Sequence, residues 1–211
     1  MLDCVTDALK NYRAIQALKN GDEEKLLSLS QAIELKDPYT KGHCKRVAEF
    51  ALMMADELRL PMEMKKEIRY GSWLHDCGKI GVPESILNLD RKLSDEEYEV
   101  IKKHPLWGAD LAKHAKLSDT VFDIIGCHHE KFNGKGYPYG LKDEDIPFPA
   151  RIVAVADVYD ALVTDRPYRK GFNQQDAIDI IENMKGETLD PVLVELLFSI
   201  LRRNKSQESA A

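Results

Sequence analysis

Apolar side chains recur at helical spacing through almost the whole of this 211-residue sequence. In residues 43–59 they stand three or four positions apart, as Val47, Phe50, Ala51, Met54 and Leu58. Positions at this spacing share one face of an α-helix, so the pattern predicts a helix with one buried side. Pro61 lacks the N–H that a helix interior needs and should end this helix, and a second helix is predicted over residues 62–75.

Capping residues and prolines mark the ends of further predicted helices. Ser94 and Glu97 have the spacing of a capping box and open a helix that should end near His104-Pro105. Other helices are predicted over residues 118–131, from Asn173 to near Gly186 and from Asp190-Pro191 onward, with a turn-rich loop over residues 133–140. We therefore predict an all-α fold, a single-domain helical bundle without a clear linker.

Residues 150–163 allow two interpretations. Their β-branched residues suggest a buried strand, whereas the length of the segment favours a helix. Helical spacing also connects its apolar side chains, which are Ile152, Val155, Ala156, Tyr159 and Leu162. We expect a helix here.

The ends of the chain are less constrained by the pattern. Residues 2–18 carry a short heptad-like stripe, which fits an ordinary amphipathic helix or a connecting helix that pairs with a second copy. We divide the chain into an N-terminal helix over residues 1–25, serving as connector or dimerisation element, a main domain over residues 26–205, and a frayed tail over residues 206–211.

Composition excludes several classes of protein. The hydrophobic share of 44% is enough for a sizeable core, and the formal net charge of −6 argues against binding to a nucleic-acid polymer. The longest apolar runs are too short to span a membrane, and the N-terminus lacks the features of a signal peptide. The four cysteines form no Cys-x-x-Cys pair, so we expect free thiols in a cytoplasmic protein and no thiolate zinc site.

Histidines and aspartates are the residues that can carry chemistry. Five of the six histidines stand beside polar or turn residues, namely His43, His75, His104, His128 and His129. Each alone is more often a surface or hydrogen-bonded histidine. The His75-Asp76 pair is more informative, because an imidazole can bind one metal and a carboxylate can bridge two. Lys79 lies one turn farther on, although it could equally be a solvated side chain.

Two further features point to metal binding. His128 and His129 are adjacent, so both reach one site only at the edge of a helix. Asp157 interrupts an apolar segment, and a buried carboxylate is costly unless it is paired or binds a metal; the alternative is a helix cap or a salt bridge. Imidazole and carboxylate ligands suit iron or manganese foremost, with zinc, nickel and magnesium also compatible. Two such ions about 3.5–4 Å apart form the usual clamp for phosphoryl displacement.

Taken together, these segments resemble the signatures of the HD-GYP domain, a branch of the HD superfamily. The strongest matches are His75-Asp76-Cys77-Gly78-Lys79-Ile80-Gly81-Val82-Pro83 and the segment from His128 to Pro138, which contains Gly136-Tyr137-Pro138. Supporting matches are the segment 37–43, His104-Pro105, Ala156-Asp157-Val158-Tyr159-Asp160-Ala161-Leu162, the segment 165–169 and Asp190-Pro191. They cover roughly residues 30–200 in the order of the family.

The resemblance implies an all-helical phosphodiesterase that converts cyclic di-GMP to the linear dinucleotide and, in some members, GMP. It implies metal ligands at His43, His75, Asp76, His104, His128, His129 and Asp157, with Asp76 bridging two divalent ions. It further implies substrate contacts from Lys79, Arg166 and Arg169, and a loop beside the pocket shaped by Gly136, Tyr137 and Pro138. Some members hold a third metal through a glutamate where this chain has Tyr39, so we expect two ions.

The expected mechanism is attack of a metal-bound hydroxide on phosphorus, in line with the leaving ribose oxygen. Asp76 and Lys79 are the expected catalytic residues, and Lys79 would offset charge on the phosphoryl oxygens. Glu130 is expected to orient a histidine. Three alternatives stay open: hydrolysis of cyclic GMP-AMP, nucleotide hydrolysis as in the wider HD superfamily, and a non-catalytic sensor of cyclic dinucleotides. A homodimer or a signalling partner domain is also possible.

Overall fold

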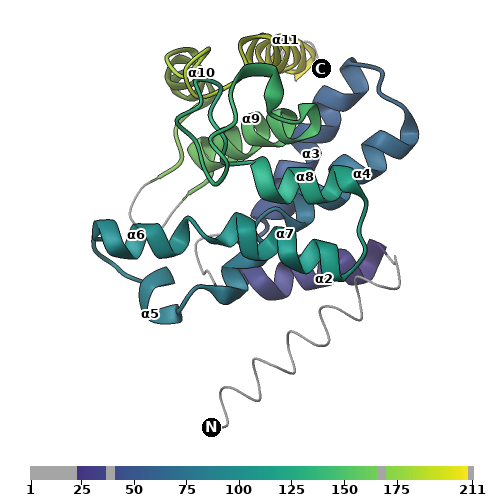
Figure 1. Cartoon of the computed structure of the whole chain (residues 1–211). Helices are drawn as coiled ribbons and strands as arrows, with labels where there is room; N and C mark the ends of the chain where they lie inside the picture. Colours follow the sequence, from purple (N-terminus) through teal and green to yellow (C-terminus); the bar gives the residue numbers. More distant parts are fainter. Residues whose placement is uncertain (1–22, 37–40, 166–169, 209–211) are drawn as a thin grey trace, which may run out of the picture.

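The computed structural model describes residues 23–36, 41–165 and 170–208, and side chains up to residue 204. Within these residues the chain is built from helices, with one isolated bridge between Lys185 and Leu189 and no strand (Figure 1). The predicted all-α class is confirmed. Residues 1–22, with the predicted N-terminal helix, lie outside the described part, as do Tyr39, Arg166 and Arg169.

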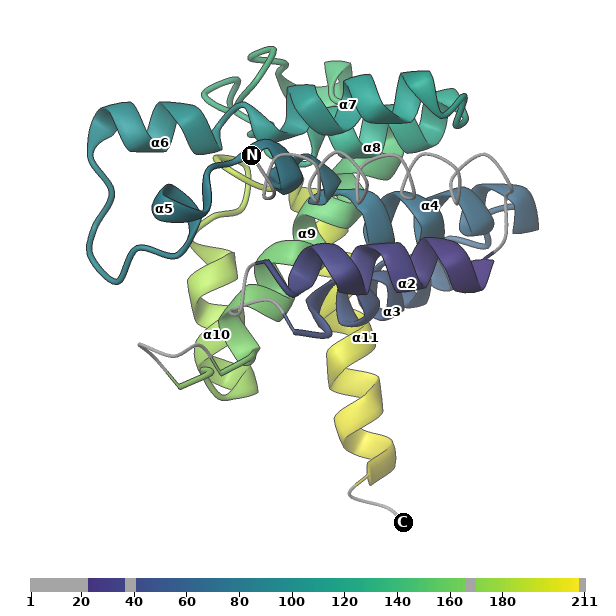
Figure 2. The ribbon, with the colours of Figure 1, turned by 90° about the horizontal axis from the view of Figure 1, so that it is seen from below.

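Three helices form one side of the bundle. Helix α2 spans Glu23–Glu34, α3 spans His43–Glu57 and α4 spans Met62–Leu74. Helices α3 and α4 pack against each other, and α2 lies across both (Figures 1 and 2). Pro61 stands directly before α4, so the predicted stop between the two long helices is confirmed.

A run of short elements follows on the opposite side. These elements are the 3₁₀ helix η1 (Cys77–Gly81), α5 (Glu84–Leu87), α6 (Asp95–Ile101), α7 (His104–His114) and α8 (Asp119–Cys127). Helix α7 packs on both η1 and α8, whereas α5 and α6 contact each other and extend to one side of the bundle (Figures 1 and 2). The capping box at Ser94 is formed as predicted, with Glu97 N–H donating to Ser94 Oγ at 3.2 Å.

One predicted helix end in this region is confirmed and another is wrong. Helix α6 ends at Ile101, close to the predicted His104-Pro105, and this pair then opens α7, because proline is well suited to the first turn of a helix. Helix α8 ends at Cys127 rather than at residue 131. Beyond it, Phe132 N–H donates to Thr188 O and Asn133 N–H to Glu187 O, so a distant segment draws the chain out of helical geometry.

The last three helices complete the bundle. A 3₁₀ turn η2 (Asp143–Asp145) precedes α9 (Phe148–Val163), α10 spans Gln174–Glu182 and α11 spans Pro191–Glu208. The ambiguous segment is therefore a helix, as expected. Asn173 caps α10, which ends earlier than predicted, and α11 includes the first three residues of the segment expected to be a tail.

The main hydrophobic core lies between α3, α9 and α11. Val47 and Met54 of α3 are fully buried, as are Ile152 of α9 and Leu197 of α11. A second cluster, which includes Leu26, Leu74 and Ile125, joins α2, α4 and α8. Because α9 is covered on several sides, an acidic residue on it needs a partner, and this condition applies to Asp157 and Asp160 below.

Among the described residues, no helix is long and apolar enough to cross a membrane. Cys44, Cys77 and Cys127 are buried and carry free thiols, and Cys4 lies outside the described residues. The cytoplasmic location stays a prediction.

Candidate metal centre

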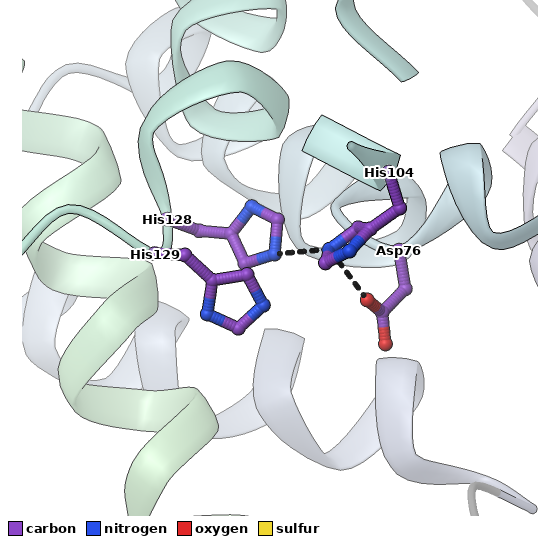
Figure 3. Close-up of side chains that lie close together, drawn as sticks. All are labelled: Asp76, His104, His128 and His129. Carbon is purple, nitrogen blue, oxygen red and sulfur yellow. Dashed lines mark hydrogen bonds and ion pairs between the residues drawn. The ribbon is translucent and has the colours of Figure 1, made fainter. Parts of the chain in front are cut away.

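Two adjoining groups of ligand-type side chains meet between the two sides of the bundle. In each group the possible ligand atoms all lie within 4.8 Å of one another. One group, drawn in Figure 3, consists of Asp76, His104, His128 and His129, and the other consists of His43, His75 and Asp157. The structure thus brings together all seven predicted ligands, and their donor set suits a divalent cation in each group.

Helix ends position most of these side chains. His43 and His104 are the first residues of α3 and α7, and His75 directly follows α4. His128 follows α8, and Asp157 alone lies inside a helix, α9. At a helix end, side chains that are neighbours in sequence can converge on a point beyond the helix, which explains how adjacent histidines serve one group.

Backbone carbonyls fix the orientation of three imidazoles. The Nδ1 atom of His75 lies 2.7 Å from Ser72 O, that of His104 lies 2.8 Å from Ile101 O, and that of His128 lies 2.9 Å from Ile125 O. A carbonyl oxygen only accepts, so each Nδ1 carries the proton and each Nε2 is left as the basic atom. The Nε2 atoms of His104 and His128 then face each other at 3.3 Å, the arrangement expected of two ligands around one ion (Figure 3).

Asp76 lies between the two groups. Its Oδ1 is 3.4 Å from Nε2 of His104, and its Oδ2 is 3.4 Å from Nε2 of His75. Each carboxylate oxygen therefore faces a different group, as a bridging ligand requires. Lys79 Nζ lies 2.8 Å from Oδ2, so the predicted cation one turn beyond Asp76 is an ion-pair partner of this carboxylate.

Burial and neighbouring charges tune these groups for metal binding. Burial lowers the pKa of His104 and His128, and it lowers the pKa of His129 to about 3. These imidazoles are thus neutral near pH 7, the form that binds a metal. Burial opposes ionisation of Asp76, but Lys79 and then His75 outweigh it and hold the pKa of Asp76 well below its usual range.

In the second group the neighbouring carboxylates raise the pKa of a histidine instead of leaving it lowered by burial. Burial lowers the pKa of His43, but its hydrogen bonds to Asp157 and Asp160 outweigh burial and raise that pKa to about 9. The partner side chains are close: Asp157 Oδ1 lies 3.1 Å from His43 Nε2, and Asp160 Oδ2 lies 2.7 Å from His43 Nδ1. Asp157 is therefore positioned where a cation would replace the proton on Nε2.

Asp160 is a candidate functional residue that the sequence reasoning did not single out. It is almost fully buried and accepts hydrogen bonds from His43, from Arg46 Nε at 2.6 Å and from Thr164 Oγ1 at 3.1 Å. It holds the His43 ring with Nε2 toward Asp157, so it orients a candidate ligand from behind. The spacing held a signal, because Asp157 and Asp160 stand three apart and share one helix face.

Replacing Asp160 with asparagine is expected to weaken divalent-metal binding about 10–100-fold, because the amide keeps the shape but loses the charge that orients His43. Equilibrium dialysis against Mn²⁺ with elemental analysis measures the effect. Asp56→Asn is the matched control, since Asp56 is an exposed residue of α3 whose carboxylate pairs with Lys65 of α4. Equal affinity of Asp160→Asn and wild type would remove the orienting role of Asp160.

Glu130 has a different partner from the one predicted. Instead of orienting a histidine, its carboxylate accepts hydrogen bonds from the backbone N–H groups of Tyr139 (2.7 Å), Gly140 (3.1 Å) and Leu141 (3.1 Å). These bonds hold the loop that contains Gly136, Tyr137 and Pro138 beside the metal ligands. Glu130 contacts the loop rather than a histidine because the chain turns back after Glu130 and brings the loop backbone next to its carboxylate.

The loop contributes an aromatic wall. The Tyr137 ring centroid lies 4.9 Å from that of His129, at an interplanar angle of 30°, and Tyr137 lines the pocket. Gly136 fits where it does only without a side chain, because a Cβ there would lie 2.2 Å from Lys131 N. The Tyr137-Pro138 peptide bond is cis. Gly136 and Pro138 lie in the predicted loop, and their role in shaping the pocket stays a prediction; Arg166 and Arg169 lie outside the described residues.

An open pocket of about 990 Å³ lies over the ligand groups. His43, Asp76, His128, His129 and Asp157 line one part of it, together with Lys79. Residues of α5, α6 and the segment that joins them line the other part. The volume is at the upper end of the range for small-molecule sites, so the pocket can accept a ligand larger than a simple phosphate.

Comparison with known proteins identifies the family to which this fold belongs. The family model described as "HD domain" matches residues 28–193. The chain is 36% identical over 189 residues to the cyclic di-GMP phosphodiesterase response regulator RpfG of Xanthomonas campestris, covering 87% of this chain and 49% of that protein. It is 34% identical over 190 residues to the 3'3'-cGAMP-specific phosphodiesterase 2 of Vibrio cholerae, covering 89% of this chain and 36% of that protein.

Solved structures include the same arrangement of helices. Bd1817, an HDG"Y"P protein from Bdellovibrio bacteriovorus, superposes with a TM-score of 0.67 at 24% identity, covering 93% of this chain and 70% of that one. The chain spans half or less of the length of the two curated relatives, so it corresponds to one part of each. The family match, the ligand groups and the loop with its Gly-Tyr-Pro sequence lead to one conclusion: the chain belongs to the HD domain family, in its HD-GYP branch.

Proposed function

We propose that this chain is a metal-dependent phosphodiesterase that hydrolyses cyclic di-GMP to the linear dinucleotide, with two divalent cations in its site; some members of the family carry the hydrolysis on to GMP. The observation that carries the proposal is the position of Asp76, whose two oxygens face the two ligand groups. When bound, the cations supply Lewis-acid chemistry that activates water and polarises a phosphoryl oxygen. We favour iron or manganese, because imidazole ligands suit iron and carboxylate ligands suit manganese; zinc and nickel also suit imidazoles.

The side chains of the site would divide the work. The seven ligands would hold the cations at a fixed separation, and Asp76 would tie them together. Lys79, which lines the pocket 2.8 Å from Asp76, would keep that carboxylate ionised and place positive charge beside the phosphodiester. The open pocket of about 990 Å³ has room for two linked nucleotides.

The substrate class is supported by the relatives, and the choice within it needs a test. RpfG carries the name of a cyclic di-GMP phosphodiesterase, whereas the Vibrio relative is named for 3'3'-cGAMP. Hydrolysis of cyclic GMP-AMP is therefore the second candidate. The decisive experiment incubates protein reconstituted with Mn²⁺ or Fe²⁺ with cyclic di-GMP, cyclic GMP-AMP and dGTP, and separates the products by chromatography.

The outcomes of this experiment differ clearly. Linear dinucleotide or GMP from cyclic di-GMP, lost on chelation and regained with metal, supports the proposal. Faster turnover of cyclic GMP-AMP would move the assignment to that substrate, and turnover of dGTP alone would indicate a nucleotidase. Binding of cyclic dinucleotides without turnover by metal-loaded protein would indicate a sensor.

We further propose that residues 1–25 connect the catalytic part to a signalling domain or to a second copy. The support is the heptad-like stripe over residues 2–18 and the length of the relatives, which extend well beyond the matched part. Deleting residues 2–18 is expected to shift the mass in solution toward that of a monomer, as measured by light scattering. A mass that falls only by the deleted residues would rule out dimerisation through this segment.

A further inference from the structure

The pocket has two chemically different sides. Imidazoles and carboxylates line one side. The side formed by α5, α6 and their connection presents apolar and aromatic side chains, among them Ile86, Leu87, Leu93 and Tyr98, together with the charged Asp90, Arg91 and Lys92. A ligand suited to both parts carries an anionic group at one end and a flat surface with polar edges at the other. A phosphodiester with attached bases has this combination.

A series of aromatic rings extends from the candidate metal ligands toward the side of the pocket formed by α5 and α6. The His129 ring contacts the ring of Tyr137, whose phenol lies close to that of Tyr98. Lys102 Nζ lies 5.6 Å from the Tyr137 ring centroid and 5.8 Å from that of Tyr98, so one ammonium group lies near both rings. The three side chains thus form one continuous surface that begins at a candidate metal ligand.

The two tyrosines differ in what their rings can still contact. Tyr137 packs on His129, and burial, followed by the neighbouring Tyr98 phenol, raises the pKa of Tyr137, so it stays neutral. Tyr98 is 47% exposed although it lines the pocket, so a ring face is available to a ligand.

Tyr98 is also held in place by its local structure. It directly follows Glu97, which accepts the Ser94 N–H at 2.8 Å and pairs with Arg91 at 2.6 Å. The capping box and this ion pair fix the first turn of α6, which carries Tyr98. An aromatic side chain on a fixed turn needs little further ordering when a ligand binds, and this favours affinity.

We propose that Tyr98 is a specificity-determining residue that stacks on one purine base of the cyclic dinucleotide while the phosphodiester lies at the two ligand groups. This inference rests on the proposed function. The recognised sequence signatures do not include Tyr98. It would make the α6 side of the pocket a base-binding subsite, so that phosphates or sugars without a base bind only through the metal-ligand side.

The test measures binding and turnover separately in Mn²⁺-loaded protein. Binding of the bisphosphorothioate analogue of cyclic di-GMP is measured by calorimetry. Turnover is measured with cyclic di-GMP itself. Because stacking on an aromatic side chain contributes measurably per base, Tyr98→Ala is expected to raise Kd and KM at least about fivefold with kcat little changed. Tyr98→Phe keeps the ring and should retain the wild-type Kd.

Leu106→Ala is the matched control, since Leu106 is an exposed apolar residue on α7 away from the pocket. An unchanged Kd in Tyr98→Ala, or a Tyr98→Phe variant as weak as Tyr98→Ala, would overturn the stacking role. The proposed function can be rejected independently of the role of Tyr98. If wild type binds the analogue but does not hydrolyse cyclic di-GMP, the phosphodiesterase proposal is rejected, and the Kd values of the variants still test whether Tyr98 stacks on a base. Wild type that binds no cyclic dinucleotide would overturn both.

Discussion

Replacing Asp76 with asparagine is expected to abolish metal binding and phosphodiester hydrolysis together. The amide has the size of the carboxylate, but only one of its two terminal atoms accepts, so it cannot bind a cation toward His104 and another toward His75. We expect kcat/KM to fall about 10³-fold or more, since the electrostatic stabilisation lost is at least that of one dedicated transition-state contact. Turnover of cyclic di-GMP and the metal content of the same samples measure both effects.

The variant also separates chemistry from folding. In wild type the ion pair with Lys79 stabilises the buried Asp76 carboxylate, so the substitution removes an anionic partner of a lysine that is only 17% exposed. Unfolding in the presence of a chelator, compared between wild type and Asp76→Asn, shows how much stability this removes. A variant that unfolds like wild type yet binds no metal supports the bridging role, whereas retained hydrolysis in a variant free of metal would contradict it.

Most of the candidate ligands could be singled out from the sequence because they stand in short, distinctive segments, whereas the full set of seven follows from the resemblance to the family. His75-Asp76 and His128-His129 are adjacent pairs, and Asp157 is an acid within an apolar run. Such patterns can be recognised without knowledge of the fold, because they depend only on neighbouring residues in the sequence. That all seven side chains meet is a property of the packing between α3, α4, α7, α8 and α9, which the motifs imply only through resemblance.

The features that were missed depend on contacts between distant segments. Glu130 lies beside the ligands in sequence, yet its partners are backbone groups nine to eleven residues later. The early end of α8 depends on hydrogen bonds to Thr188 and Glu187, more than fifty residues away. Local propensity contains no record of such bonds, and neither the helix end nor the partner of Glu130 could be inferred from it.

The role of proline shows the limit of a local rule. The residue before a proline is disfavoured in a helix, so the helix that Ser94 opens was predicted to end near His104-Pro105, and it ends at Ile101. The same proline also suits the first turn of a helix, and the prediction did not include the helix α7 that begins at His104. The choice matters for function, because it places His104 at the start of α7, where its ring can face His128.

Replacing Gly78 with alanine is expected to have the largest effect on stability of any single-methyl change near the site. A Cβ on Gly78 would lie 1.8 Å from His104 O and 2.6 Å from Gly108 N, and both atoms belong to the backbone of α7. Backbone atoms cannot move aside as a flexible side chain can, so η1 and α7 must separate. Overpacking of this kind is expected to lower the free energy of unfolding by about 3 kcal/mol or more.

The site should fail along with the packing. Asp76 directly precedes η1 and His104 begins α7, so a shift between these elements pulls the ligands of one group apart. Denaturant unfolding and Mn²⁺ affinity test both consequences. Gly126→Ala is the control: Gly126 lies in α8, and a Cβ there would meet its nearest atom at 3.5 Å, so the helix should tolerate or gain from the methyl group. Equal denaturant midpoints for Gly78→Ala and Gly126→Ala would contradict this prediction. They would mean that the backbones of η1 and α7 are not in close contact, and that some other contact holds His104 near Asp76.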